Sequence, residues 1–187
     1  KENTILVGGH TNEASEINIG FSVHGFVKKE QMLKKSGGQE GDSIFLTKPL
    51  GTGVLFAGLM AGVAKGAWID DVLIQMTRSN SRSAEILAKY ASCMTDVTGF
   101  GLVGHLSEML KENLSAEISL DCIPIYRGAE ELSRLGIEST LLPENLKTSH
   151  KKPKSMDNHD KIKLCFDPQT AGGILAIVNQ KSVGECQ

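Results

Sequence analysis

The stretch MTDVTGFGLVGH, residues 94–105, places the carboxylate of Asp96 shortly before the expected start of a helix. A carboxylate oxygen is a preferred ligand of Mg²⁺, so Asp96 is a candidate metal ligand. Thr98 can cap the helix that follows, and the free N–H groups at a helix start also favour an anion. Aspartate is equally common as a turn or capping residue, so the spacing alone leaves Asp96 open between a metal ligand and a structural residue.

Three glycines of this stretch, Gly99, Gly101 and Gly104, fit the G-x-G-x-x-G pattern of dinucleotide-binding folds. In those folds a hydrophobic strand comes directly before the glycines. Here apolar residues at helical spacing in residues 81–91 predict a helix, and residues 92–96 are expected to link it to the glycines. A Rossmann fold is therefore only weakly supported.

Outward from this stretch, the apolar pattern predicts a mixture of helices and strands, which indicates an α+β fold. Residues 17–27 alternate most clearly, with Ile17, Ile19 and Phe21 on one face of a half-buried strand. The polar residues 147–161 predict an exposed, flexible loop. Further strands are expected at residues 43–47, 116–120, 162–166 and 173–178. Further helices are expected within residues 54–65, within 70–78 with Asp70 or Asp71 as the cap, at 101–112 and at 127–135.

Three other loops combine glycines with polar residues. Residues 7–11 (VGGHT) can bring backbone N–H groups close to phosphate oxygens, or can form a plain Gly-Gly turn. Lys48, within TKPLGTG (residues 47–53), can meet a phosphate, although a Lys-Pro pair more often ends a strand before a tight helix entry. Residues 167–173 (DPQTAGG) form either a loop beside a ligand or a structural turn.

The composition is that of an ordinary globular protein. The chain has 187 residues and a net charge of −2, which argues against a broad nucleic-acid surface. Its longest apolar stretch, residues 51–64, is shorter than the roughly 18 residues that a membrane-spanning helix needs, and residues 1–10 lack the apolar core of a secretory signal. Four cysteines without C-x-x-C spacing indicate a reduced, intracellular protein. We therefore expect no nucleic-acid partner and no membrane segment.

Several motifs, in this order along the chain, resemble those of the selenide, water dikinases. The resemblance covers residues 5–178, and its most specific part is TDVTGFG. More distantly, the chain is similar to the wider AIR-synthase-like superfamily of ATP-dependent enzymes. The motifs are LVGGHT (6–11), LTKPLGTG (46–53), M-x-x-x-N (76–80), MTDVTGFGLVGH (94–105), STLLPEN (139–145) and DPQTAGG (167–173).

The resemblance implies a cytoplasmic enzyme that converts ATP, selenide and water into selenophosphate, AMP and phosphate. It implies that residues 17–187 form an α/β sandwich of the AIR-synthase-related carboxy-terminal type. Residues 1–16 would then be the end of an amino-terminal ATP-binding domain. Asp96 matches a Mg²⁺ ligand of the family. The family segment that contacts ATP, across the interface of a homodimer, corresponds to Gly8, Gly9, His10 and Thr11.

The chain also departs from the family pattern. The family's reactive cysteine or selenocysteine, with its nearby lysine, is expected upstream of Lys1, so no catalytic residue is assigned within this chain. The family continues for a further helix and strand beyond the position of Val178, and Ala171 stands where serine is common in bacterial members. We interpret the chain as the carboxy-terminal part of such an enzyme, inactive alone. The alternatives are a catalytically silent relative that acts as a binding or regulatory subunit, and another ATP-dependent superfamily enzyme such as a thiamine-phosphate kinase.

Overall fold

The computed structural model describes residues 4–148 and 160–186 of the chain. Contacts between residues divide it into two units, one up to Met32 and one from Leu33 onward. The expected loop at residues 147–161 lies mostly outside the described residues. Its flanks are helical, since Lys147 lies in one helix and Lys161 lies in the next.

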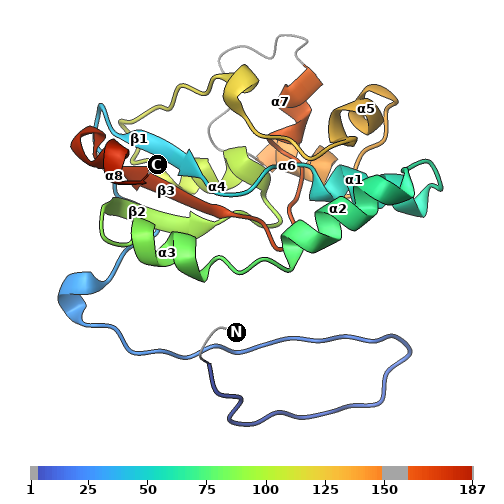
Figure 1. The fold of residues 1–187 in the computed structure, drawn as a ribbon, viewed down its shortest axis with the longest axis horizontal. Helices are drawn as coiled ribbons and strands as arrows, with labels where there is room; N and C mark the ends of the chain where they lie inside the picture. The colour runs from blue at the N-terminus through green and yellow to red at the C-terminus, as the bar shows by residue number, and fades with distance from the viewer. Residues whose placement is uncertain (1–3, 149–159, 187) are drawn as a thin grey trace. The chain divides into compact units, whose positions relative to one another are not determined.

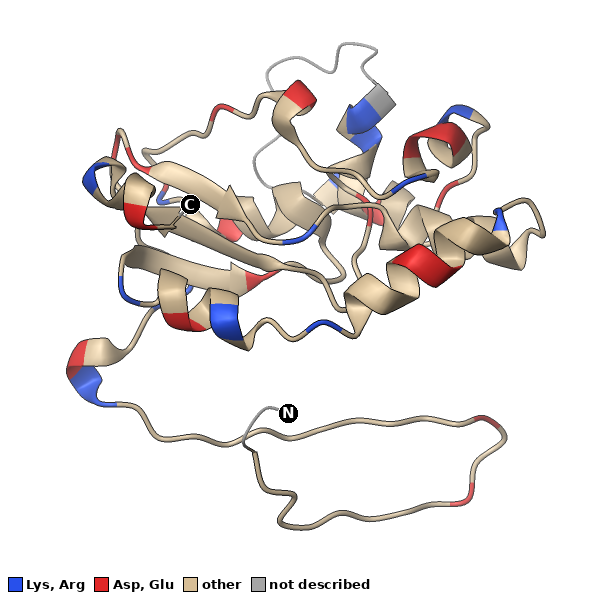
Figure 2. Cartoon of the chain, viewed as in Figure 1, with Lys and Arg blue, Asp and Glu red and all other residues tan. Residues whose placement is uncertain are grey.

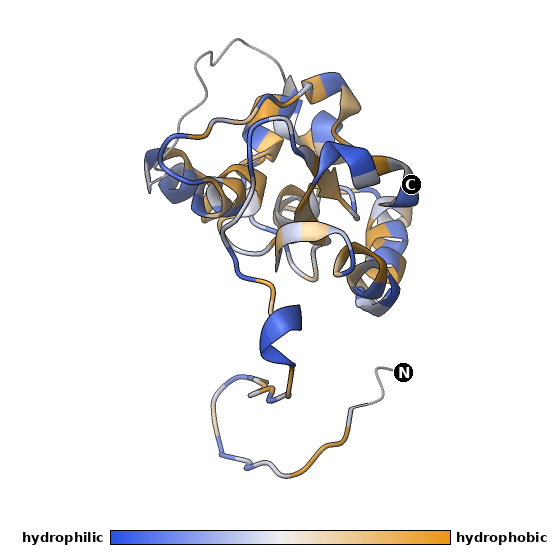
Figure 3. Ribbon diagram, turned by 90° about the vertical axis from the view of Figure 1, so that its left-hand side faces the viewer, coloured by the Kyte–Doolittle hydropathy of each residue, from blue (hydrophilic) through white to orange (hydrophobic). Residues whose placement is uncertain are grey.

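The first unit contains no strand among its described residues, so the strand predicted at residues 17–27 is wrong. Its only regular element is a 3-10 helix, η1 (Lys29–Gln31). Hydrophobic and hydrophilic residues follow one another along this segment (Figure 3), and Ile17 and Phe21 are almost fully exposed. A strand needs backbone hydrogen bonds to a neighbouring strand, and the described residues supply none to this segment. Alternation alone therefore does not produce a strand here.

A three-stranded sheet lies at the centre of the second unit, in the order β1-β3-β2. The strands are β1 (Ser43–Leu46), β2 (Ala91–Asp96) and β3 (Ile174–Val178). Both outer strands run antiparallel to β3, and Asp96 pairs with Ile174. Consequently β1 and β2 run parallel to each other, and both end at the sheet edge where β3 begins (Figure 1).

Helices cover both faces of this sheet and form a second layer beside it (Figure 1). Helix α4 packs beside β2, and α3 packs against β3. The helices are α1 (Thr52–Met60), α2 (Gly66–Met76), α3 (Ser81–Leu87), α4 (Gly101–Met109), α5 (Ala129–Arg134), α6 (Leu142–Thr148), α7 (Asp160–Leu164) and α8 (Val183–Cys186), with 3-10 turns η2 (Leu120–Cys122) and η3 (Gln180–Ser182).

The central strand β3 is buried on both faces, as its unbroken apolar sequence ILAIV predicts. Leu175 and Ile177 join the cluster formed with α4, whereas Ala176 and Val178 join the cluster around Leu87 of α3. Alternate residues of one strand thus serve two separate cores.

The remaining helices enclose a third apolar cluster. Leu55 of α1, Trp68 and Val72 of α2 and Leu132 of α5 are its buried members, with Leu164 of α7. These side chains hold α1, α2, α5 and α7 together beside the sheet. Burial of a large apolar side chain contributes about 1.5–3 kcal/mol, so this cluster anchors the helical layer.

Most predicted elements of the second unit are confirmed, with shifted ends. Strands β1 and β3 and helices α1, α3, α4 and α5 form where the sequence pattern places them. Helix α2 begins at Gly66 rather than at the expected cap, so Asp70 and Asp71 lie inside the helix. The predicted link at residues 92–96 is also wrong, because it is strand β2. A strand therefore does precede the glycines, but it is an edge strand of an antiparallel sheet, which still excludes a Rossmann arrangement.

Two other predicted strands do not form. Residues 162–166 begin in helix α7, and Leu164 and Phe166 enter different apolar clusters rather than one sheet face. Residues 116–120 pack their apolar side chains against the sheet but make no ladder with β1. Their neighbour Ile125 forms a single parallel bridge with Leu50. Side-chain packing takes the place of backbone pairing in this segment.

Candidate functional site

Three of the motif loops meet at the edge where β1 and β2 end and β3 begins. They are residues 47–53 after β1, residues 96–101 after β2 and residues 167–173 before β3. The sequence predicted each loop separately, and the antiparallel pairing with β3 brings all three together. The carboxyl ends of strands at a sheet edge are a common location for ligand sites in α/β proteins.

Backbone hydrogen bonds join the loop after β2 to the loop before β3. The Val97 N–H donates to the Gly173 carbonyl at 2.9 Å, and the Gln169 N–H donates to the Thr98 carbonyl at 2.9 Å. A Cβ atom on Gly172 would lie 2.1 Å from the Val97 carbonyl oxygen, so only glycine permits this approach. The two loops therefore form one rigid pair.

The start of helix α1 is bound by side chains of the DPQTAGG loop. The N–H groups of Gly51 and Thr52 donate to Gln169 Oε1 at 3.0 and 3.2 Å, and the Val54 N–H donates to Asp167 Oδ2 at 3.2 Å. These amides are the groups that a phosphate would need at this helix start. Because Gln169 and Asp167 occupy them, the glycines of TKPLGTG serve a structural junction here.

Asp167 is a buried carboxylate at this junction. Burial raises its pKa to about 6, while hydrogen bonds from Val54, Ser139, Gln169 and Gly53 act in the opposite direction. Its Oδ1 and the Ser139 hydroxyl are both buried, and neither completes a hydrogen bond of regular geometry. Asp167 therefore places a titratable group within the core of the loop assembly.

Two asparagines from other motifs bind carbonyl groups of the same loops. Asn145 Nδ2 donates to the Gly99 carbonyl at 2.8 Å and to the Phe166 carbonyl at 2.9 Å. Asn80 Nδ2 donates to the Gly172 carbonyl at 2.9 Å. The motifs M-x-x-x-N and STLLPEN thus support the loops from neighbouring segments.

Lys48 is buried beneath this edge with only 8% of its surface exposed. Its ammonium donates to the Arg78 carbonyl at 2.8 Å and to the Ala171 carbonyl at 3.1 Å. Burial lowers the pKa of Lys48. Ala171 has a φ of +50°, a left-handed conformation that is uncommon for a residue other than glycine. The carbonyl contact from Lys48 helps to hold this turn in place.

Asp96 ends β2 with an exposed side chain at the same edge. Among residues 4–148 and 160–186, no group of three acidic, histidine or cysteine side chains is arranged to hold a metal ion. No ion pair or hydrogen bond within those ranges engages the Asp96 carboxylate. The carboxylate is therefore available as one ligand to a cation whose other ligands come from elsewhere.

Thr98 does not cap helix α4, contrary to the expectation from the sequence. Its N–H donates to His105 Nε2 at 3.1 Å, and its hydroxyl lies 3.1 Å from the same atom. Because Nε2 accepts, the neutral ring carries its proton on Nδ1. Burial and then Lys35 lower the pKa of His105, while Glu108 and Asp96 raise it. The neutral imidazole thus fixes the turn directly after Asp96.

The four residues expected to contact ATP, Gly8, Gly9, His10 and Thr11, belong to the first unit. All four are exposed, and a Cβ atom added to Gly8 or Gly9 would meet nothing within 4 Å. Asp96 belongs to the second unit, so the ATP-contacting role of these four residues stays a prediction.

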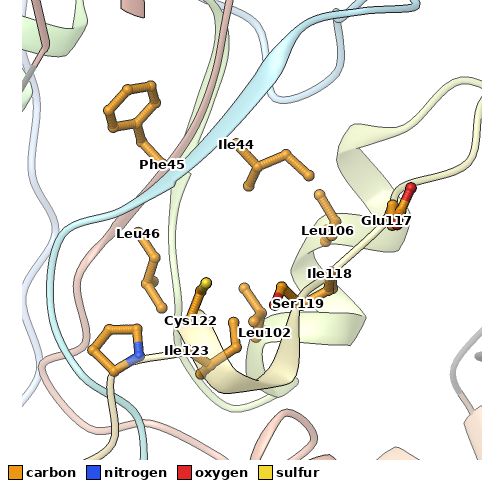
Figure 4. Close-up of a pocket in the computed structure, with 11 residues that line it drawn as sticks. Ile44, Phe45, Leu46, Leu102, Leu106, Glu117, Ile118, Ser119, Cys122 and Ile123 are labelled. Carbon is orange, nitrogen blue, oxygen red and sulfur yellow. The ribbon is translucent and has the colours of Figure 1, made fainter.

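An apolar cavity of about 330 Å³ lies between β1, α4 and residues 117–124 (Figure 4). Ile44, Leu46, Leu106 and Ile118 line it, with the Cys122 thiol facing the same space (Figure 4). Neither Asp96 nor the loop side chains described above line this cavity. Its apolar walls do not suit a phosphate, so the sheet edge remains the candidate site.

Charged residues of both signs are interspersed along the second unit (Figure 2). No helix within the described ranges is long and apolar enough to cross a membrane.

The roles of Asn80, Asn145, Asp167 and Gln169 were not assigned from sequence, although each lies in a motif that was noted. Local patterns could not reveal these roles, because apart from the Gln169–Asp167 contact the hydrogen-bond partners lie 21 to 118 residues away along the chain.

Comparison with known proteins identifies the family of this chain. The family model described as AIR synthase related protein, C-terminal domain, matches residues 39–185. The chain is 39% identical over 185 residues to the selenide, water dikinase of Campylobacter jejuni subsp. jejuni, covering 98% of this chain and 54% of that protein. It is 39% identical over 181 residues to selenide, water dikinase 2 of Peptoclostridium acidaminophilum, covering 95% and 52%. The chain thus spans about half the length of the curated relatives it matches.

A solved structure supports the fold. The crystal structure of thiamine-monophosphate kinase from Stenotrophomonas maltophilia K279a aligns with a TM-score of 0.55 over 84% of this chain and 46% of that chain. The two sequences are 16% identical, so this similarity concerns the fold alone. It confirms the expected α+β architecture of the AIR-synthase-related type.

Proposed function

Because this chain belongs to the AIR synthase related protein family, as a C-terminal domain, we propose that it is the carboxy-terminal part of a selenide, water dikinase. In this proposal the whole enzyme converts ATP, selenide and water into selenophosphate, AMP and phosphate. The similarity to proteins named selenide, water dikinase extends over 98% of the chain, which favours this function over that of other superfamily kinases.

One structural observation carries the proposal: the motif loops form a single hydrogen-bonded assembly that presents the Asp96 carboxylate. Val97 and Thr98, which directly follow Asp96, are held by hydrogen bonds to Gly173, Gln169 and His105. A plain capping aspartate would bind the N–H groups of its own helix, and Asp96 does not. This favours the metal-ligand role that the sequence left open.

Asp96 fits Mg²⁺ as one ligand of a set that the rest of the enzyme would complete. The ion prefers oxygen ligands and keeps several waters, so one exposed and unpaired carboxylate suits it. When bound, Mg²⁺ would neutralise phosphate charge during phosphoryl transfer. The chain's own part is to hold the carboxylate in place, through the Thr98–His105 contacts and the pairing of Asp96 with Ile174.

The ATP-contacting role of Gly8, Gly9, His10 and Thr11 is part of the same proposal. Their exposed backbone, without side chains at the two glycines, allows close approach to phosphate oxygens. The whole enzyme would be a cytoplasmic homodimer, with these residues contacting ATP across the dimer interface. The isolated chain is expected to form no selenophosphate, because the reactive cysteine or selenocysteine and other metal ligands would lie in the remaining half of the enzyme.

A chimeric enzyme tests this function. The half of the Campylobacter jejuni relative that this chain does not match is joined to the chain, and selenophosphate formation from ATP, Mg²⁺ and selenide is followed by ³¹P NMR. We expect the chimera to form selenophosphate and AMP, and the chain alone to form neither. A folded, dimeric chimera without activity, beside an active native relative, would contradict the proposal and favour a silent binding subunit.

The same chimera with Asp96→Asn tests the metal role. Loss of one charged oxygen ligand should lower the rate by about 10²–10³, the usual effect of removing a single electrostatic contact in an active site. The fold should remain intact, since the Asp96 carboxylate supports no hydrogen bond among the described residues. Normal turnover, or loss of the fold measured by circular dichroism, would show that Asp96 is structural.

A further inference from the structure

Lys48 is a buried positive charge without an anionic partner. Its side chain lies beneath the sheet edge with 8% exposure, and no carboxylate of the described residues lies within ion-pairing distance of its ammonium. Buried charges in proteins are normally paired, because an isolated ammonium loses its hydration on burial. The buried Lys48 ammonium, without a carboxylate partner among the described residues, would therefore be stabilised by a bound anion.

The contacts of Lys48 leave room for such an anion. An ammonium has three N–H donors, and two of them are directed at the carbonyls of Arg78 and Ala171. Both of those residues are exposed, so the ammonium lies directly below the surface. The neighbouring Thr170 is exposed as well, and its hydroxyl makes no hydrogen bond within the described part of the chain.

We propose that Lys48 forms the base of a binding site for a phosphate oxyanion, on the surface made by Arg78, Thr170 and Ala171. The third ammonium N–H and the Thr170 hydroxyl are donors that match phosphate oxygens, and the Arg78 guanidinium adds a positive charge on the same surface. The proposed donors do not include Asp96 or residues 8–11, and the proposal does not depend on the chain being part of a selenide, water dikinase.

The alternative is that Lys48 only links two carbonyl groups. Asn80 offers a matched comparison, because its Nδ2 binds the adjacent Gly172 carbonyl at 2.9 Å without carrying a charge. If Lys48 is purely structural, removal of the Lys48 side chain and removal of the Asn80 side chain should have the same effect on phosphate binding. If Lys48 binds the anion, only its removal should weaken phosphate binding.

Thermal unfolding of the chain with inorganic phosphate tests the proposal. The proteins are the wild type, Lys48→Met, Asn80→Ala and Lys181→Met, the last removing one exposed charge elsewhere. Sodium chloride at equal ionic strength separates specific binding from screening. We expect a saturable rise in melting temperature for the wild type, Asn80→Ala and Lys181→Met. Lys48→Met should bind phosphate at least about tenfold more weakly, the loss expected from one charge-assisted hydrogen bond.

A measurement on the wild type keeps the proposal falsifiable if Lys48→Met fails to fold. Titration with inorganic phosphate, followed by ¹H–¹⁵N NMR, should shift the amide signals of Arg78, Thr170 and Ala171 and leave α8 unchanged. Phosphate binding that is equal in Lys48→Met and the wild type would overturn the site. Absence of stabilisation in the wild type, loss of the response in Asn80→Ala, or NMR shifts confined to other segments would overturn it too.

Discussion

Among single residues, Asp167 shows how two opposed electrostatic effects meet in one side chain. Its carboxylate binds the amide of Val54 at the start of α1, a position that favours negative charge. Burial opposes that charge and is the larger effect, so the pKa rises to about 6 from an ordinary value of 3.8. Gln169 adds a bond to the same oxygen at 3.1 Å, which fixes the carboxylate without neutralising it.

The raised pKa of Asp167 predicts a pH-dependent stability. The folded protein binds this proton more tightly than the unfolded chain, so its contribution is complete below about 3.8 and is lost as the pH rises through about 6. The shift of about two pKa units corresponds to about 3 kcal/mol. Asp167→Asn does not titrate, so the variant should lack this decline. Urea unfolding of both proteins between pH 4 and about 7 measures the difference. If the free energy of unfolding changed with pH in the same way in both proteins, the expectation would be refuted.

At the scale of elements, helix α4 depends on the glycine at its first position. Gly101 has a φ of +68°, and a Cβ atom there would lie 2.7 Å from the Phe166 carbonyl carbon. Gly99, two residues earlier, has a negative φ, and a Cβ atom there would meet nothing within 4 Å. Two glycines of one motif therefore have different physical roles.

Alanine substitution separates these two glycines. Gly101→Ala should destabilise the protein by at least about 2 kcal/mol, because a left-handed conformation costs about 1–2 kcal/mol for alanine and the backbone contact adds to it. Gly99→Ala should change the free energy of unfolding by less than about 0.5 kcal/mol. Chemical denaturation provides both values. Equal effects of the two substitutions would mean that the turn adjusts freely and that the strain at Gly101 is not real.

Local sequence patterns predict some of these helices and strands and fail for others. Strands β1 and β3 and helices α3 and α4 follow from local apolar spacing, because the burial of each element is decided by its own periodicity. The alternating residues 17–27 and 116–120 fail as strands, since a strand also needs a neighbour whose presence no local pattern reveals. Asp96 could be proposed from its motif, whereas the contacts of Lys48 could not, because they join residues 30 and 123 positions away.

At the scale of the whole molecule, the apolar core belongs entirely to the second unit. All three clusters of buried residues lie beyond Leu33, whereas residues 4–32 are exposed throughout. The second unit therefore contains the interactions needed for its own stability.

Removal of residues 1–32 should accordingly leave the fold of the remainder unchanged. We expect the shortened chain to retain its melting temperature within about 2 °C, since no buried apolar surface is lost. It should lose any ATP binding that depends on Gly8, Gly9, His10 and Thr11. Calorimetry measures the first property and titration with ATP the second. A large loss of stability would show that the first unit contributes to the core.

The order of strands in the sheet has a consequence for synthesis of the protein. β3 lies between β1 and β2, yet it is the last of the three to leave the ribosome. Until residue 178 has emerged, β1 and β2 lack the strand with which both pair in the described part of the chain, and their apolar side chains stay exposed. The sheet is therefore assembled only after residues 174–178 have been made, and we expect a nascent chain stalled before Ile174 to bind chaperones that shield apolar surface.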